Sequence, residues 1–315
     1  MRSYRLDCSG RMDCLGYDGT SVPCNCSGCY TGGIYACEVS GNVEFSKSCC
    51  MMTAKDIMHP NDLKTIQVLK SIPYCDTICR KIMEYGYERV FRGENLGTMV
   101  KASGKCLTRV YKLMQKTARC VGIAVPEVYV YNDPVMNAFT YGETNPFVCI
   151  SSSCVEKLTD DELVCLMAHE CGHILCKHTL YNSVVNLIQM FGEQLGIITR
   201  SMSKPIYIAL QYWSRQSEYS ADRCAAAVAG EKVFQQMTMK LASGLEDVQG
   251  DPYQLVRQAK EYNDFEEQSL WDKIQQNCRM AFYSHPQMVN RAKEIDRWKN
   301  SFAYKGQRLA MNINQ

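Results

Sequence analysis

The sequence predicts an α+β protein that is mostly helical, with a small β-sheet and a short cysteine-rich segment at its N-terminus. Beyond residue 50, apolar residues recur mainly at helical spacing, while three short runs between residues 126 and 151 are rich in β-branched and aromatic residues. The first 50 residues hold eight of the 19 cysteines and show little apolar periodicity. We therefore expect three parts: a cysteine-rich segment (1–50), one main domain (51–302) and a C-terminal tail (303–315).

Residues 1–50 hold too few apolar residues to build a core without a staple. Cys24, Cys26 and Cys29 are close enough to share a metal ion, and Cys26-Ser-Gly-Cys29 has the spacing of a zinc-binding pair. The fourth ligand of such a structural zinc site would be Cys8, Cys14 or Cys37. A thiol-rich tail and a set of disulfides are the alternatives. Disulfides are less favoured because the chain starts without an apolar secretion signal.

The main domain opens with helices and then turns to strands. Helices are expected over residues 62–71, 78–90 and 107–120, and a strand over 127–131. Two more extended runs, 137–142 and 147–151, are separated by Gly142 and Pro146, which indicates a hairpin-like turn. A short helix is expected over 153–158.

The clearest helix begins at Thr159. Thr159 and Glu162 have the spacing of a capping box, and the two aspartates between them favour the positive end of a helix. Farther on, the apolar stretch 181–213 is interrupted by charges and by Pro205, so we expect two helices rather than a membrane span. An alanine-rich helix is expected from Trp213 to Ala229.

Composition narrows the function classes. The formal net charge is +2 and no long block of like charge occurs, so we expect no nucleic-acid partner. No run of apolar residues is long enough to cross a membrane. We expect a cytoplasmic protein, with peripheral membrane contact by residues 181–213 left open as a less favoured alternative.

The helix that begins at Thr159 contains an H-E-x-x-H motif, His169-Glu-Cys-Gly-His173. Histidines at positions i and i+4 project from one helical face, so two imidazoles can bind one zinc ion. Glu170 is offset from them and can accept the proton of an activated water without ligating the metal. By chance, a surface helix can also carry two histidines at this spacing, but this pair accounts for two of only five in the chain.

A catalytic zinc site needs a third protein ligand. The segment Glu218-Tyr-Ser-Ala-Asp222 supplies two carboxylates that face the same way on a helix. Glu218 could complete the site while Asp222 orients a ligand histidine from behind. An ordinary acidic helix face is the alternative interpretation of these two residues.

With these motifs the sequence resembles the HtpX-like and CAAX-prenyl-protease-like zinc metallopeptidases, a branch of the gluzincins. The resemblance spans roughly residues 51–302 and rests on four segments in the right order. They are Asn137-Ala-Phe-Thr, His169-Glu-Cys-Gly-His173, Ser217-Glu-Tyr-Ser-Ala-Asp222-Arg223 and Ser284-His-Pro-Gln-Met-Val-Asn-Arg291. It implies a gluzincin-type fold, with a small sheet over the active-site helix.

The resemblance also implies roles for single residues. The zinc ligands would be His169, His173 and Glu218, and the general base would be Glu170. Asn137 would bind substrate on the edge strand above the site, and His285 would help to stabilise the tetrahedral transition state. Without the resemblance, Asn137 would be interpreted as a turn residue and His285 as a surface histidine before proline.

The favoured function is thus a zinc endopeptidase that cleaves unfolded or extended protein segments. The alternative is a catalytically silent binding or holdase protein that keeps the peptidase fold. A third hypothesis gives residues 1–50 the main role, in docking a partner or sensing a metal. The sequence departs from the family in two ways. Many members carry membrane-spanning helices, and we expect none here. Three cysteines lie within or next to the H-E-x-x-H motif, where they are either small core residues or thiolates that compete for the metal. They are Cys165, Cys171 and Cys176.

Overall fold

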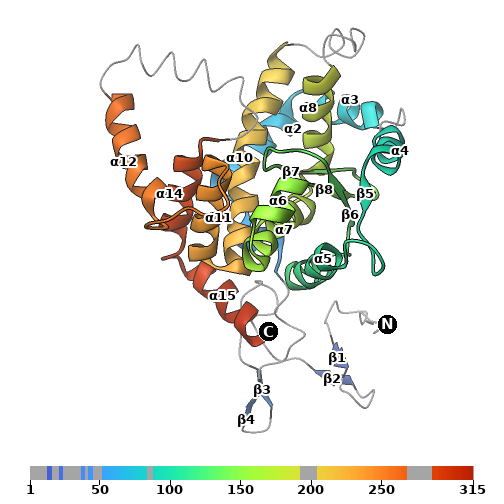
Figure 1. The fold of residues 1–315 in the computed structure, drawn as a ribbon. Coiled ribbons are helices and arrows are strands. Elements are labelled where there is room, and N and C mark those ends of the chain that lie inside the picture. The colour runs from blue at the N-terminus through green and yellow to red at the C-terminus, as the bar shows by residue number, and fades with distance from the viewer. Residues whose placement is uncertain are drawn as a thin grey trace. The chain divides into compact units, whose positions relative to one another are not determined.

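The computed structural model describes residues 52–83, 88–191, 204–267 and 286–314, together with four short strands within the first 50 residues (Figure 1). Contacts between residues divide the chain into two compact units, residues 1–50 and 51–315. In the first unit, β1 (Asp13–Leu15) pairs antiparallel with β2 (Ser21–Pro23), and β3 (Cys37–Val39) pairs antiparallel with β4 (Asn42–Glu44).

The second unit is mostly helical and carries one small sheet. The helices that precede the strand β6 (Glu127–Tyr131) along the chain are α1 (Ala54–Ile57), α2 (Pro60–Ser71), α3 (Cys75–Ile82), α4 (Glu88–Thr98) and α5 (Thr108–Val121). Those that follow are α6 (Ser152–Lys157), α7 (Asp160–Leu175), α8 (Thr179–Phe191), α10 (Lys204–Ala229), α11 (Glu231–Ser243), α12 (Gln254–Glu267), α14 (Met288–Trp298) and α15 (Phe302–Asn314). The strands are β5 (Val100–Lys101), β6 (Glu127–Tyr131), β7 (Ala138–Tyr141) and β8 (Phe147–Ser151).

The four strands form a mixed sheet in the order β5-β6-β8-β7. β6 runs parallel to β8, and the other two pairings are antiparallel. The strand β8 is buried along its whole length, whereas β7 forms an edge of the sheet. The turn after β7 needs Gly142, which has a φ of 94° and where a Cβ atom would lie 3.0 Å from the carbonyl oxygen of Asn145.

The two long helices α7 and α10 lie side by side at the centre of this unit (Figure 1). Their backbones approach closely at Gly172, where a Cβ atom would lie 2.8 Å from the Cβ atom of Cys224 and 3.0 Å from Cα of Ala221. The capping box predicted for Thr159 and Glu162 is present at the start of α7. The N-terminus of α7 is therefore fixed by hydrogen bonds between neighbouring residues. The part of α7 around Gly172 is fixed by packing against α10.

Three helix boundaries differ from the expectation. Residues 78–90 contribute to two helices, α3 and α4, because Arg80 and Lys81 suit the end of one helix and Glu88 the start of the next. α10 begins at Lys204 rather than at Trp213, since a proline in the first turn of a helix loses no hydrogen bond.

Residues 303–315 differ from the expected tail. Up to Asn314 they belong to α15, whose Ala310 and Met311 are buried. Arg308 donates hydrogen bonds to the carbonyl oxygens of Ala227 (3.0 Å) and Val228 (2.7 Å), two of the unpaired carbonyls at the end of α10. The segment packs as a helix because it covers apolar surface and caps α10.

None of the helices in the described part of the chain combines the length and apolar composition that a membrane crossing requires.

Candidate metal centre

Three potential ligands converge between the two central helices. His169 and His173 project from α7 one turn apart, and Glu218 projects toward them from α10. The Nε2 atoms of the two histidines lie 3.3 Å apart. The Glu218 carboxylate lies 3.4 Å from Nε2 of His169 and 3.3 Å from Nε2 of His173. Among the described residues this is the group of side chains that could hold a metal ion, and all three are buried.

These separations suit a small tetrahedral cation. Zinc binds histidine nitrogen and carboxylate oxygen at about 2.0–2.2 Å, so neighbouring ligands of a tetrahedral site lie roughly 3.3–3.6 Å from each other. Two imidazoles and a carboxylate are also a donor set that zinc uses in catalytic sites, where the fourth position stays open. The residues present therefore fit a zinc ion in both chemistry and spacing.

Glu170 lies on α7 between the two histidines in sequence and is 4% exposed. It is not part of the converging group. The hydroxyl of Thr140, on the edge strand β7, donates a hydrogen bond of 2.5 Å to Oε2 of Glu170. This contact ties the carboxylate to the sheet and leaves its other oxygen for a water molecule.

Behind His169 lies a buried ion pair. Oδ1 of Asp222 is 3.0 Å from Nδ1 of His169, which is within hydrogen-bonding distance. Arg291 on α14 donates from Nε to Oδ2 (2.9 Å) and from Nη2 to Oδ1 (2.5 Å) of the same carboxylate. Because Asp222 is held as an anion, it favours the His169 tautomer with hydrogen on Nδ1 and a lone pair on Nε2.

The pKa values reflect these contacts. Burial alone would raise the pKa of Asp222, but the charge and hydrogen bonds of Arg291 lower it. Burial opposes protonation of His169, yet Asp222 and Glu218 raise its pKa to about 10. Burial lowers the pKa of His173. The two ligand histidines therefore differ in basicity, because only His169 faces two carboxylates.

Sequence reasoning missed four residues around these ligands. Thr140 and Arg291 lie inside segments that carried the family resemblance, so their motifs were the available signal. His178, one of only five histidines, follows His173 by five residues. Asp62 lies more than a hundred residues away on α2, and no sequence pattern connects it to the site.

The remaining predicted site residues are Asn137, His285 and four N-terminal cysteines. Asn137 immediately precedes β7, is exposed, and its carbonyl oxygen accepts a hydrogen bond from the backbone N–H of Ser151 (2.9 Å). His285 lies outside the described residues. So do Cys24, Cys26 and Cys29, while Cys37 lies on β3.

The cysteines of α7 lie in the core. Cys165 and Cys171 are fully buried, and Cys176 is half-buried at the helix end. Burial raises the pKa of all three thiols, which disfavours the thiolate form that competes for metal. Their burial supports the interpretation as small core residues.

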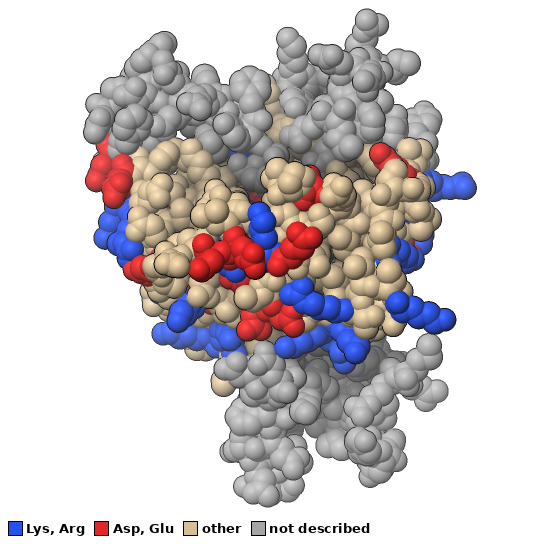
Figure 2. Space-filling model, in the orientation of Figure 1, with Lys and Arg blue, Asp and Glu red and all other residues tan. Residues whose placement is uncertain are grey.

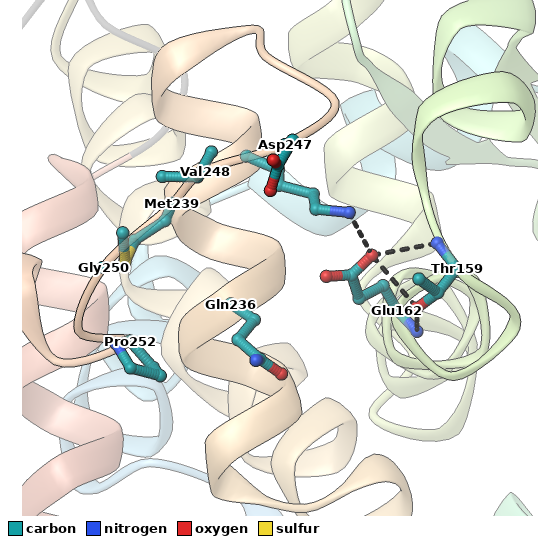
Figure 3. A pocket seen from close by; sticks show the side chains of 9 residues that line it. Thr159, Glu162, Gln236, Met239, Asp247, Val248, Gly250 and Pro252 are labelled. Carbon is teal, nitrogen blue, oxygen red and sulfur yellow. Dashed lines mark hydrogen bonds and ion pairs between the residues drawn. The ribbon is translucent and has the colours of Figure 1, made fainter.

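Cavities lie at both ends of α7. At the N-terminal end, Figure 3 shows Glu162 accepting hydrogen bonds from Thr159 and from Lys240 on α11, beside a cavity of ≈ 270 Å³. At the C-terminal end, a cavity of ≈ 700 Å³ is lined by charged residues of α2, α3 and the β7–β8 turn and by Ile174 and Lys177. In the face drawn in Figure 2, acidic and basic side chains lie intermixed.

Comparisons with known proteins agree with this site. Residues 107–299 match the model of peptidase family M48. The chain is 30% identical over 259 residues to the plastoglobule-localized metallopeptidase 48, chloroplastic, of Arabidopsis thaliana, a match that covers 81% of this chain and 75% of that protein. It is 28% identical over 147 residues to the protease HtpX homolog of Nitrosomonas europaea, covering 37% of this chain. A match of the same length to the protease HtpX of Alkalilimnicola ehrlichii has 30% identity.

The fold and the buried ligand group define a metal-dependent hydrolase, and the family match covers the helices that carry both. The chain belongs to peptidase family M48 and is a metallopeptidase related to HtpX. Its match spans about half the length of the two HtpX relatives, 50% and 49%.

Proposed function

We propose that this metallopeptidase is a zinc-dependent endopeptidase that hydrolyses peptide bonds in unfolded or extended protein segments. The observation that carries the proposal is the buried convergence of His169, His173 and Glu218 at tetrahedral spacing, with Glu170 beside it. When bound, zinc supplies a Lewis acid that lowers the pKa of a water molecule to about 7 and polarises a carbonyl group. The residues of the chain supply the rest.

Glu170 is the general base. Its carboxylate, oriented by Thr140, accepts the proton of the attacking water and later passes it to the amine that leaves. His285 is proposed to donate to the oxyanion of the tetrahedral transition state, as the family resemblance implies. Asp222 holds His169 in the ligating orientation.

Substrate would bind along the sheet edge. Among the described strands, β7 lies at an edge of the sheet, and its Thr140 hydroxyl donates a hydrogen bond to Glu170. An extended peptide added beside β7, held partly by Asn137, would place its backbone carbonyl next to the general base. A folded substrate cannot offer such a strand, so unfolded or extended segments are favoured.

The test is cleavage of unfolded casein by the full chain, with the metal content measured in the same samples. Wild type should carry zinc at the site and cleave casein, and a chelator should abolish cleavage until zinc is restored. The His169→Ala, His173→Ala double variant should lose one zinc ion per chain together with the activity. Casein binding without cleavage in the zinc-loaded wild type would refute the proposal and favour the silent holdase alternative.

A further inference from the structure

His173 has a buried partner that the family motif does not assign. Its Nδ1 atom lies 3.1 Å from Nδ1 of His178, which is 2% exposed. On its other side, Nε2 of His178 lies 3.0 Å from Oδ2 of Asp62 in a bent ion-pair contact. Asp62, His178 and His173 therefore form a continuous row of buried side chains from α2 to the metal site.

The end of α7 places His178 there. The N–H of His178 donates to the carbonyl oxygen of His173 (2.9 Å), and the N–H of Lys177 donates to that of Ile174 (3.1 Å). This is the Schellman pattern of helix ends, with Lys177 in the left-handed conformation at a φ of 60°. The chain reverses at that residue, so the ring that follows the helix folds back against the last metal ligand.

Asp62 is built as a fixed acceptor. It is fully buried, and α10 supplies two donors to it: Nε1 of Trp213 (3.0 Å) and the hydroxyl of Ser220 (2.5 Å). Burial opposes ionisation, but contacts with His178, Ser220 and Trp213 lower the pKa of Asp62. The Asp62 carboxylate therefore attracts the edge of the His178 ring that carries Nε2.

These contacts match what metal ligation requires of His173. If Nε2 of His173 binds the metal, its Nδ1 atom carries the hydrogen and needs an acceptor. The facing Nδ1 atom of His178 is that acceptor when the hydrogen of His178 lies on Nε2, beside Asp62. The other side-chain neighbour of His173 Nδ1, Nδ2 of Asn182, is 3.5 Å away, too far for a strong hydrogen bond.

We propose that His178 and Asp62 are positioning residues that hold the ring of His173 in the orientation required for metal ligation. The inference rests on the proposed metal site. Each of the two ligand histidines would then be oriented by a buried aspartate. Asp222 contacts His169 directly, whereas Asp62 acts on His173 through the ring of His178. Residues that orient a metal-ligating histidine typically contribute about 10–100-fold in metal affinity.

The test measures zinc affinity of the full chain by competition with a chromophoric chelator. The His169→Ala, His173→Ala variant gives the background from any other site. We expect His178→Phe to weaken zinc binding about 10–100-fold. His178→Asn should recover most of the loss, because its amide oxygen can accept from His173 near the position of the lost Nδ1 atom. The matched control is His59→Phe, a buried histidine on the N-terminal side of α2 whose ring contacts Asn61 and Glu294.

Nitrogen-15 spectra of the zinc-loaded wild type provide a second readout that does not depend on a variant folding. They should show His178 with hydrogen on Nε2 and none on Nδ1. Hydrogen on Nδ1 of His178, wild-type zinc affinity in His178→Phe, or an equal loss in His59→Phe would each overturn the inference while the zinc site stands. If the wild type binds no zinc above the double-variant background, the proposed function itself fails, and the inference fails with it.

Discussion

At the scale of single residues, the role of each acidic group follows from what faces it. Glu218 faces two imidazoles, Asp222 faces an imidazole and Arg291, and Glu170 faces the hydroxyl of Thr140. All three carboxylates are buried, yet only Glu218 belongs to the group that could hold a metal ion. The partners of these carboxylates, not their exposure, are what distinguish the proposed ligand from the proposed orienting group and the proposed base.

Glu170→Gln tests the base. Glutamine has nearly the same shape and can still meet the Thr140 hydroxyl, but it cannot accept a proton from water. Casein hydrolysis should fall by at least about 10²–10⁴-fold, the usual contribution of a general base, while zinc content stays at the wild-type level. Turnover and metal content measured on the same preparation decide it, and turnover close to wild type would remove Glu170 from the mechanism.

Arg291 tests the buried ion pair. Arg291→Met leaves Asp222 buried without its counter-charge, so the free energy of unfolding of the metal-free chain should drop by about 3–5 kcal/mol. The double variant with Asp222→Asn removes both charges and should cost clearly less than the sum of the single changes. Urea unfolding of the four proteins gives the coupling, and additive costs would show that the two residues act independently.

At the scale of elements, the metal site depends on how closely α7 approaches α10. The histidines lie on α7 and Glu218 lies on α10. The distance between the facing sides of the two helices therefore sets the distance between Glu218 and the histidines. Gly172, one residue before His173, lies where the backbone of α7 closely approaches α10. Glycine is needed there because a methyl group would occupy space already filled by Cys224 and Ala221.

Gly172→Ala should therefore destabilise the chain although alanine favours helices. Overpacking of this kind costs about 1–3 kcal/mol, which exceeds the ~0.5–1 kcal/mol that alanine gains over glycine within a helix. Zinc affinity should fall as well, because the added methyl group pushes the ligand faces apart. Gly93→Ala in α4 is the control, since a Cβ atom there meets nothing within 4 Å and should be neutral or stabilising. Equal stability of the two variants in thermal unfolding would contradict the close-packing argument.

At the scale of the whole molecule, the chain divides into a helical unit with the catalytic apparatus and a cysteine-rich unit of 50 residues. The described strands of the smaller unit are three residues long and form two separate pairs. Hairpins this small are marginal in water without further support. Thiolate-bound zinc remains our prediction for that support.

Removal of residues 1–50 should therefore lower the zinc content by one ion per chain. Residues 51–315 should keep their fold and their casein hydrolysis, because every catalytic residue proposed here lies within them. Mass-spectrometric metal analysis of the two proteins, with a circular dichroism melt of the shorter one, makes the comparison. Equal zinc content in both would eliminate the N-terminal zinc and leave a thiol-rich segment.

The sequence predicted most of the local structure of the catalytic unit. The strands over 127–131 and 147–151 and the capped start of α7 are present because β-branched runs, glycine turns and capping boxes act through neighbouring residues. The H-E-x-x-H spacing placed two histidines on one face of α7 for the same reason. Boundaries that depend on tertiary packing were predicted less well, as α15 and the start of α10 show.

Sequence alone thus determined the local elements, the candidate ligands His169, His173 and Glu218, and the resemblance to HtpX-like peptidases. Only the tertiary structure decided which distant groups stand behind those ligands. Asp62 lies on α2 and Arg291 on α14, and each reaches a buried histidine that no short-range pattern links to it. The reason is physical: capping and periodicity act within a few residues, whereas a buried charge needs a partner from whichever element packs against it.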